Sequence, residues 1–264
     1  MAAASKEERQ QRIIELLEQD GRVQVRDLAE CCDVTEMTVR RDLDDLEQEG
    51  VLLRVHGGAI LRQNRKEPDG LKRETSYMVR AGLHQDRKEE LAVLAASLIQ
   101  PGSTVFLDSG TTTCAIAQKA PAQDGCTYIT NGVNVAMALL ERGCTRVIVI
   151  GGEVDLNTWS SRGAMAVEQV RKLRFDTAFL ACNAVSSDGA VMIGNDAETA
   201  MKRAVMQAAH RVYLTADSTK FDGYSLVSYA AVGDFDAVIT DSGLDRSRID
   251  RMPDFGDRLI QPQA

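Results

Sequence analysis

Two adjacent arginines, Arg40 and Arg41, lie in the stretch TEMTVRRDLDDLEQEGVLLRVH, which spans residues 35–56. A guanidinium group can donate two hydrogen bonds to one guanine in the DNA major groove. An arginine pair on an exposed helix face is therefore suited to reading base edges. The same pair is also typical of a solvated surface helix, so its interpretation depends on the elements that position it.

The first half of this stretch predicts an amphipathic helix. Val39, Leu43 and Leu46 recur at helical spacing and form one apolar stripe. Thr35 is a suitable N-cap, and Gly50 is a suitable stop. The residues that point away from the stripe are Met37, Arg41, Asp44 and Gln48, flanked by Thr38 and Arg40.

The neighbouring segments predict a winged helix-turn-helix domain over residues 1–62. A short helix is expected from Val25, with a turn at 32–34, and VLLRVHGGAIL (51–61) predicts a hairpin that turns at two glycines. Residues 6–19 predict a further amphipathic helix that covers this pair. In such a domain the wing can reach phosphate or the minor groove. The predicted DNA-binding residues are Thr35, Met37, Thr38, Arg40, Arg41, Arg54 and His56.

The charge of this predicted domain does not favour diffuse attraction to DNA. Residues 1–62 hold nine Lys and Arg against fourteen Asp and Glu, a net charge of −5. A domain without a basic excess binds nucleic acid weakly and without specificity. The distribution is more favourable, because Glu36 is the only acidic residue from Thr35 to Arg41. Local charge, rather than the sum, decides the contact surface.

A second group of residues is suited to binding a phosphorylated polyol. Predicted strands end in the segments DSGTTT (108–113), TNG (130–132), GGE (151–153) and DSTK (217–220). Hydroxyls and free amides at a helix start form an anion cradle, and a lysine adds a point charge for phosphate. A simple helix cap is the alternative for each segment alone. The predicted effector-binding residues are Asp108, Gly110, Thr111, Thr112, Thr113, Asn131, Gly151, Gly152 and Lys220.

These segments lie in a predicted α/β domain over residues 81–264. Short apolar strands alternate with helices there, which predicts a mostly parallel sheet covered on both faces. Ligands of such sheets bind beyond the carboxyl ends of the strands. A polar stretch at 63–80, with Pro68 and Asp69-Gly70, predicts the linker. Neither a Walker A loop nor a GxGxxG motif is present, so no nucleotide cofactor is expected.

The motifs resemble those of the DeoR family of bacterial transcription regulators. TVRRDLDDLE and GVLLRVHGGA resemble its N-terminal signature, with Thr35 where serine is usual. FLDSGTTT, ITNG, VIVIGG and LTADSTKF resemble its C-terminal sensor domain. The resemblance implies a sensor of the ribose-5-phosphate isomerase or CoA transferase type that binds a sugar phosphate. The segment 182–203 matches less well, although Asp188-Gly189, Glu198 and Lys202 are kept, and this leaves the ligand's identity open.

Composition restricts the class of protein further. The 264 residues are 44% hydrophobic with a net charge of −8, and no apolar run approaches the ~20 residues that span a bilayer. The N-terminus lacks an apolar signal core, so a cytoplasmic protein is expected. The six cysteines form no CxxC pair and no cluster with histidine, so buried thiols rather than a metal site are expected.

The sequence predicts a DNA-binding transcriptional regulator that represses a carbohydrate-metabolism operon until a phosphorylated sugar relieves it. Its expected partners are double-stranded operator DNA, the sugar phosphate and further copies of itself, as a homodimer or homotetramer, with no membrane. The alternative is a sugar-phosphate isomerase or deaminase with an appended DNA-binding head. Acid–base chemistry would then come from Asp108, Glu153, Glu198 and Lys220. A constitutive DNA-binding scaffold with a vestigial sensor is a third possibility.

Overall fold

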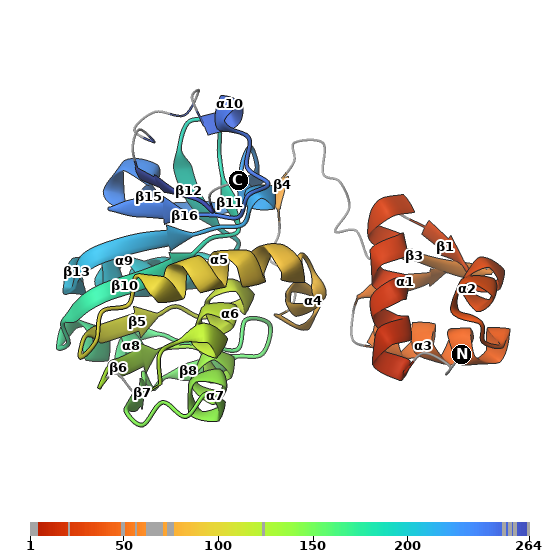
Figure 1. Ribbon diagram of the computed structural model, residues 1–264, viewed down its shortest axis with the longest axis horizontal. Helices are drawn as coiled ribbons and strands as arrows, with labels where there is room; N and C mark the ends of the chain where they lie inside the picture. The colour runs from red at the N-terminus through yellow and green to blue at the C-terminus, as the bar shows by residue number, and fades with distance from the viewer. Residues whose placement is uncertain are drawn as a thin grey trace. The chain divides into compact units, whose positions relative to one another are not determined.

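The computed structural model describes residues 5–20, 22–48, 51–55, 57–61, 71–72, 77–122, 125–249, 252, 255 and 258–262. The chain divides into two compact units, each with its own core (Figure 1). Unit 1 comprises Met1–Glu67 and Met78–Leu83, and unit 2 comprises Pro68–Tyr77 and His84–Ala264. The predicted boundaries at 62 and 80 remain a prediction, since most of the expected linker lies outside the described residues.

Unit 1 is a three-helix domain with a small antiparallel sheet. Its strand order is β1-β3-β2, and strands β2 and β3 form the predicted hairpin. Strand β1 was not expected from the sequence. The elements are α1 (Lys6–Asp20), β1 (Arg22–Gln24), α2 (Val25–Cys32), α3 (Glu36–Gln48), β2 (Leu52–Val55) and β3 (Gly58–Leu61).

The core of unit 1 contains the apolar stripe that the sequence predicted on α3. Val39, Leu43 and Leu46 are buried with Ile13 and Leu17 of α1. Arg9 of α1 donates two hydrogen bonds to the buried carboxylate of Asp42, at 2.9 and 3.2 Å. Helix α1 therefore holds α3 through apolar packing and a two-pronged ion pair.

Unit 2 is built on a seven-stranded sheet in which every neighbouring pair is parallel. The strand order is β17-β16-β13-β10-β5-β6-β7, which confirms the prediction of a mostly parallel sheet. The strands are β5 (Thr104–Leu107), β6 (Thr127–Thr130), β7 (Val147–Val149), β10 (Phe175–Ala181), β13 (Ala209–Thr215), β16 (Ala237–Ile239) and β17 (Leu259–Ile260).

Helices cover both faces of this sheet because successive strand residues point to opposite sides. Val105 and Leu107 pack with one group of helices, and Phe106 between them packs with the other. The first group is α5 (Gln85–Ser97), α6 (Thr111–Lys119) and α7 (Val133–Glu141), and the second is α8 (Ala164–Arg171) and α9 (Thr199–Ala208).

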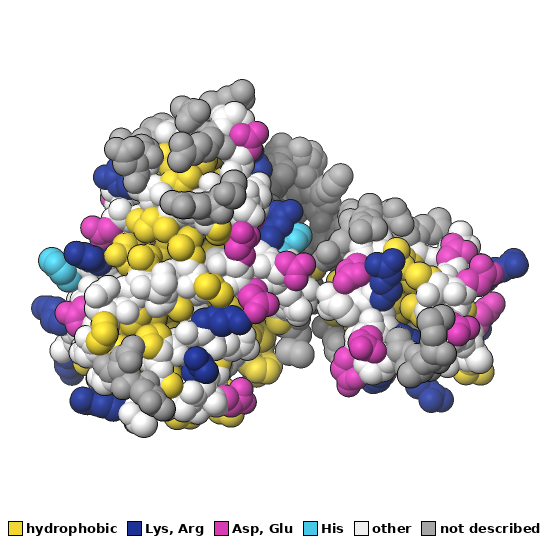
Figure 2. All heavy atoms as spheres, viewed as in Figure 1, with side chains coloured by type: hydrophobic (Ala, Val, Ile, Leu, Met, Phe, Trp, Pro, Cys, Tyr) yellow, Lys and Arg dark blue, Asp and Glu magenta, His cyan; other side chains and the backbone are white. Residues whose placement is uncertain are grey.

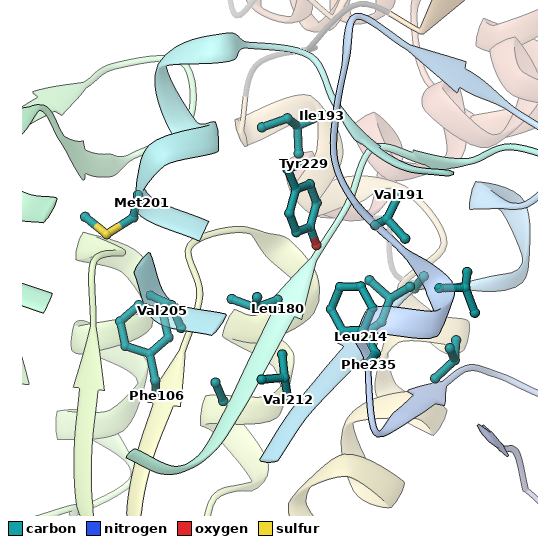
Figure 3. Close-up of a cluster of buried hydrophobic side chains, with 14 of the residues drawn as sticks. Phe106, Leu180, Val191, Ile193, Met201, Val205, Val212, Leu214, Tyr229 and Phe235 are labelled. Atoms are coloured by element: carbon teal, nitrogen blue, oxygen red, sulfur yellow. The ribbon is translucent and has the colours of Figure 1, made fainter. Parts of the chain in front are cut away.

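A small antiparallel sheet extends the core on the side of α9. Its order is β11-β12-β15, and Figure 3 shows Val191 and Ile193 of β12 and Tyr229 of β15 within one apolar cluster together with Leu180 of β10. The sequence did not predict this sheet. Its strands are β11 (Ala184–Val185), β12 (Ala190–Ile193) and β15 (Val227–Ala231).

The remaining elements are short. A hairpin of β8 (Glu153–Asp155) and β9 (Ser160–Arg162) precedes α8, and neither the hairpin nor α8 was expected from the sequence. The others are β4 (Leu71–Lys72), α4 (Tyr77–Gly82), the 3-10 turns η1 (Asp196–Glu198), η2 (Ser218–Lys220) and η3 (Val232–Asp234), β14 (Tyr224–Ser225) and α10 (Arg246–Ile249). Within the described residues, no helix is long and apolar enough to cross a membrane.

Candidate functional site

The start of helix α3 has the cap that the sequence predicted. The Thr35 hydroxyl accepts a hydrogen bond from the Thr38 amide at 3.2 Å, and the two threonine hydroxyls lie 3.0 Å apart. The predicted stop at Gly50 and the predicted contact residue His56 lie outside the described residues.

Helix α3 presents the predicted polar face to solvent. Met37 is 71% exposed, and both arginines are exposed. Arg40 pairs with Glu36 one turn earlier at 3.0 Å, which offsets part of its charge. For Arg41 the described residues supply no ion-pair partner. Figure 2 shows basic and acidic side chains interspersed on the visible face of unit 1. The basic character is confined to the N-terminal half of α3, because four of its five acidic residues follow Arg41.

Arg54 of the wing is bound to helix α3. Its Nη1 donates to the Asp44 carboxylate and to the Arg40 carbonyl oxygen, both at 3.0 Å. Its backbone amide donates to Glu47 at 2.7 Å. The predicted phosphate contact remains a prediction, but the observed geometry gives this guanidinium a role within the protein.

The candidate effector site lies where the strand order of the parallel sheet reverses. The chain runs outward from β5 through β6 to β7, and then returns to the other side of β5 with β10 and β13. In open α/β sheets the crevice at this reversal is the usual ligand site. The structure therefore brings the carboxyl ends of β5, β6 and β10 together, as the sequence analysis expected for β5 and β6.

The turn from β5 into α6 has no side-chain cap. Gly110 is the N-cap of α6 with a φ of 130°, a conformation that favours glycine, and it offers no capping side chain. The first intrahelical bond runs from the Cys114 amide to the Gly110 carbonyl. The amides of Thr111, Thr112 and Thr113 precede this bond and point along the positive end of the helix dipole.

Two asparagines beside this turn have buried oxygens without a partner in the described structure. Asn134 Nδ2 donates to the Gly110 carbonyl at 3.3 Å, and Asn131 Nδ2 donates to the Ser161 carbonyl at 3.3 Å. Their Oδ1 atoms are buried and lack hydrogen-bond partners. A buried acceptor without a donor is costly. A ligand that carries hydroxyl groups would supply the missing donors.

The Asp108 carboxylate is engaged within the protein, and the sugar contact predicted for it remains a prediction. Its carboxylate accepts hydrogen bonds from the Ser109 and Ala181 amides, at 2.9 and 3.0 Å, and forms an ion pair with Lys202 of α9. Lys202 also donates to the Ala181 carbonyl at 3.0 Å. The pair is almost fully buried and joins α9 to the carboxyl ends of β5 and β10.

The surroundings of Lys202 favour its charged form. Burial alone would lower the pKa of Lys202, but attraction to Asp108 and Glu198 outweighs burial, and the pKa lies above its usual value. Burial raises the pKa of Tyr229 well above its usual value. The Tyr229 hydroxyl donates to the Ala181 carbonyl at 3.1 Å, and its ring lies 5.3 Å from the Lys202 ammonium.

Glu198 connects this cluster to the β8–β9 hairpin. Its buried carboxylate accepts a hydrogen bond from the Ser160 hydroxyl at 3.2 Å, and that hydroxyl lies 2.7 Å from the Thr158 hydroxyl. The Ser161 amide donates to the Asn131 carbonyl at 2.7 Å. The hairpin is thus fastened to both the α9 side and the β6 side of the site.

The predicted glycines Gly151 and Gly152 lie at the base of this hairpin. Both the amide and the carbonyl of Gly151 are bonded to the Gln169 side chain, at 3.1 and 3.0 Å. A Cβ on Gly152 would lie 2.6 Å from the Arg162 carbonyl oxygen. In the observed structure these glycines therefore allow the hairpin and α8 to pack closely, and their predicted ligand contact remains a prediction.

Lys220 lies at the carboxyl end of β13, two strands from β5. Two strand spacings amount to about 10 Å. The pKa of His84, at the start of α5, is lowered mainly by burial. Asp217 raises this pKa, and the positive charges of Arg87, Lys220 and Lys88 lower it. Lys220 therefore belongs to a basic group at the start of α5, and the structure gives no contact between Lys220 and the α6 turn.

No site role was predicted from the sequence for the buried residues Lys202, Tyr229, Ser160 and Lys88. A signal for Lys202 was available, because Glu198 and Lys202 are four residues apart and residues at this spacing share one face of a helix. Within the described residues, no group of three or more His, Cys, Asp or Glu side chains is placed to hold a metal ion.

Comparison with known proteins finds two family domains in this chain and relatives that match most of its length. Residues 9–65 match the model of the DeoR-like helix-turn-helix domain, and residues 83–242 match that of the DeoR C terminal sensor domain. The putative aga operon transcriptional repressor of Escherichia coli O157:H7 is 33% identical over 96% of this chain and 93% of its own. The glycerol-3-phosphate regulon repressor of Escherichia coli K12 is 32% identical over 87% of this chain and 88% of its own.

Among solved structures, ribose 5-phosphate isomerase A from Methanocaldococcus jannaschii is similar over 52% of this chain and 54% of its own, with a TM-score of 0.39 and 15% identity. The predicted fold class is confirmed, with a helix-turn-helix domain followed by a parallel-sheet α/β domain. Both family models and the length of the matches with named repressors lead to one conclusion. The chain belongs to the DeoR family of DNA-binding transcriptional regulators.

Proposed function

We propose that this regulator represses a carbohydrate-metabolism operon and that a phosphorylated sugar or polyol, bound at the carboxyl ends of β5 and β6, releases it from DNA. The observation that carries the proposal is the open N-terminus of α6 beside two buried asparagine oxygens that lack donors. The amides suit a phosphate, and the oxygens suit hydroxyl groups. The name of one relative, the glycerol-3-phosphate regulon repressor, includes a compound of this class.

A thermal-shift screen against sugar phosphates and the same sugars without phosphate tests the proposal. A ligand present at 100 times its Kd stabilises the folded state by about 2.7 kcal/mol, which raises the Tm measurably. We expect a rise with at least one phosphorylated compound and none with its phosphate-free counterpart. The same compound should release the protein from its operator. Equal shifts for both compounds, or no shift across the panel, would contradict the proposed ligand class.

A proline at the first position of α6 tests the proposed phosphate cradle. Proline suits this position, so Thr111→Pro removes one backbone donor while the helix can still form. We expect the variant to lose most of the ligand-induced rise in Tm and to keep its own Tm close to that of the wild type. The matched control is Ala164→Pro, at the first position of α8 after another glycine N-cap. An undiminished ligand shift in Thr111→Pro would place the phosphate elsewhere.

The regulator is proposed to act as a homodimer or homotetramer. With a net charge of −5 in the DNA-binding head, two heads acting together would supply affinity that one lacks. The second copy is proposed to cover helix α7, where Val133, Met137 and Leu140 are exposed at helical spacing, together with the exposed Ile148 of edge strand β7. The only charged residue on α7 is Glu141, so two such faces can meet about a two-fold axis without burying opposed like charges.

Sedimentation of the full chain tests this assembly. Met137→Glu puts a charge at the middle of the α7 face and should produce a smaller species with weaker operator binding. Met165→Glu, at another exposed methionine, is the matched control and should keep the wild-type assembly. A monomeric wild-type protein would show that a different partner covers α7. Turnover of any ligand from the screen would instead favour the enzyme alternative.

A further inference from the structure

Trp159 has an unusual backbone conformation in the turn between β8 and β9. Four non-glycine residues in the described part of the chain have positive φ, and three of them are Asp or His, which tolerate the left-handed region. Trp159, with a φ of 57°, is the bulky exception. A conformation of this kind persists only where surrounding contacts hold it, and such positions cluster at ligand clamps and switches.

Two contacts hold Trp159 in this conformation. Its ring stacks on the ring of Tyr77, with centroids 5.0 Å apart and planes inclined by 20°. The Tyr77 amide donates a hydrogen bond to the Asn157 carbonyl at 2.6 Å, in the same turn. Tyr77 is buried, so the turn of the hairpin and Tyr77 itself are packed together within unit 2.

The other end of the hairpin belongs to the candidate effector site. The Val133 amide donates to the Trp159 carbonyl at 2.9 Å, directly after the turn that carries Asn131. Ser160, the next residue, donates to Glu198. Any change in hydrogen bonding at Asn131 or Glu198 therefore acts on the backbone that carries Trp159.

Tyr77 is also the first residue of helix α4, which continues with residues that group with unit 1. Unit 2 includes Pro68–Tyr77, and Met78–Leu83 cluster with the DNA-binding unit. Within unit 1, the Gly82 carbonyl at the end of α4 accepts a hydrogen bond from Gln11 of α1 at 3.5 Å. Helix α1 in turn holds α3 through Arg9 and Asp42.

We infer that the stack of Trp159 on Tyr77 couples the effector site to the DNA-reading helix. A change at the effector site alters the β8–β9 hairpin, and the hairpin moves Trp159 against Tyr77. Helix α4, which begins at Tyr77, transmits this movement to α1, the helix that holds α3. The effector half of this inference rests on the function proposed above. The DNA half does not depend on the identity of the effector. Coupling between two sites is reciprocal, so DNA bound to unit 1 must also affect the stack.

The test uses the fluorescence of Trp159, which is the only tryptophan in the sequence. Full-length protein is titrated with acrylamide as a quencher, alone and with a DNA duplex that the protein has selected from a random library. We expect DNA binding to shift the quenching constant of the wild type. Tyr77→Phe, which keeps the ring, should behave in the same way. Tyr77→Leu, which removes the stack, should show no DNA-dependent shift.

The matched control is Tyr224→Leu, at an exposed tyrosine of unit 2 whose ring stacks on no aromatic side chain in the described part of the structure. It should retain the wild-type shift. The inference is overturned if DNA leaves Trp159 quenching unchanged in the wild type, or if Tyr77→Leu shifts as the wild type does. The Tm and circular dichroism of each variant establish that it is folded.

A second readout covers the case in which Tyr77→Leu does not fold. A sugar phosphate that raises the wild-type Tm should weaken DNA binding by about 5–150-fold, the usual range of coupling between sites. Trp159→Leu should bind both ligands and lose this effect. If no sugar phosphate raises the Tm, the proposed effector class fails, and the inference is still overturned if DNA leaves the quenching of Trp159 in the wild type unchanged.

Discussion

Lys202 on helix α9 forms a buried ion pair with Asp108 at the carboxyl end of strand β5, 94 residues earlier in the chain. Asp108 also accepts hydrogen bonds from the amides of Ser109 and Ala181. One carboxylate thus ties together the α6 turn, the end of β10 and α9. The ion pair therefore holds the carboxyl ends of β5 and β10 in place beside the candidate site.

Removing one partner of this pair should destabilise unit 2 strongly. Lys202→Met leaves the Asp108 carboxylate buried without its counter-charge, which typically costs about 3–5 kcal/mol. Urea unfolding of the full chain, followed by far-UV circular dichroism, measures the change. Combining it with Asp108→Asn should recover part of the loss. The control is Lys172→Met, whose exposed ion pair with Glu168 should matter little. Equal losses in the two single variants would contradict the structural role of Lys202.

Alkaline pH should destabilise unit 2 through the same cluster. Burial raises the pKa of Tyr229, and the neighbouring carboxylates raise that of Lys202 despite its burial. Each group keeps its proton in the folded state at a pH where the unfolded chain has lost it. The resulting stability is therefore present below about pH 10, near the ordinary pKa of both groups, and is lost as the pH rises further. Urea unfolding over this pH range measures the decline, which should be shallower in Tyr229→Phe. An unchanged slope in that variant would show that Tyr229 does not contribute.

The position of Arg54 predicts a specific pattern of DNA-binding losses. Arg54→Ala should weaken operator binding because the wing loses its bonds to α3, and Asp44→Asn should weaken it for the same reason. Operator affinity measured at several salt concentrations separates this role from a phosphate contact. Loss of a phosphate contact reduces the salt slope by about 1. We expect an unchanged slope for Asp44→Asn. A reduced slope in Arg54→Ala alone would support the phosphate contact predicted from the sequence, and an unchanged slope there would limit Arg54 to its bonds with α3.

The local elements of the fold could be predicted from the sequence, and several long-range contacts could not. The stripe of Val39, Leu43 and Leu46 lies within one helix, so its period alone indicates the buried face. The parallel strands are short apolar runs between helices, so they too can be recognised from the local sequence. Strand β1 has three residues and pairs with β3 far along the chain, so no local pattern marks it.

The candidate site was predictable where glycine or a strand end marks a turn, and not where the chemistry depends on tertiary contacts. Gly110 and Asn131 follow the apolar strands β5 and β6, whose carboxyl ends are paired side by side. The role of Asp108 depends on Lys202, and that of Trp159 on Tyr77, across 94 and 82 residues of chain. Neither pairing can be inferred from spacing.

Lys220→Ala should separate effector response from DNA binding. Lys220 is proposed to supply positive charge for the ligand phosphate, and it belongs to unit 2, whereas helix α3 belongs to unit 1. Operator affinity without ligand should equal that of the wild type, and the sugar phosphate that releases the wild type should no longer release the variant. Lys172→Ala serves as the control for loss of one positive charge in the same unit. Normal release of Lys220→Ala would remove this lysine from the phosphate site.

Arg41→Ala should cost about 1–3 kcal/mol of specific operator binding, because an exposed arginine on the reading face of α3 can bond to guanine. The control is Arg26→Ala on α2, an exposed arginine that pairs with Glu30. Both variants change the net charge of unit 1 by the same amount, so non-specific electrostatic attraction falls equally in both. Fluorescence anisotropy with the operator and with an unrelated duplex measures the two contributions. A loss confined to the operator in Arg41→Ala supports base reading, whereas equal losses in both variants would mean that this face of α3 does not enter the major groove.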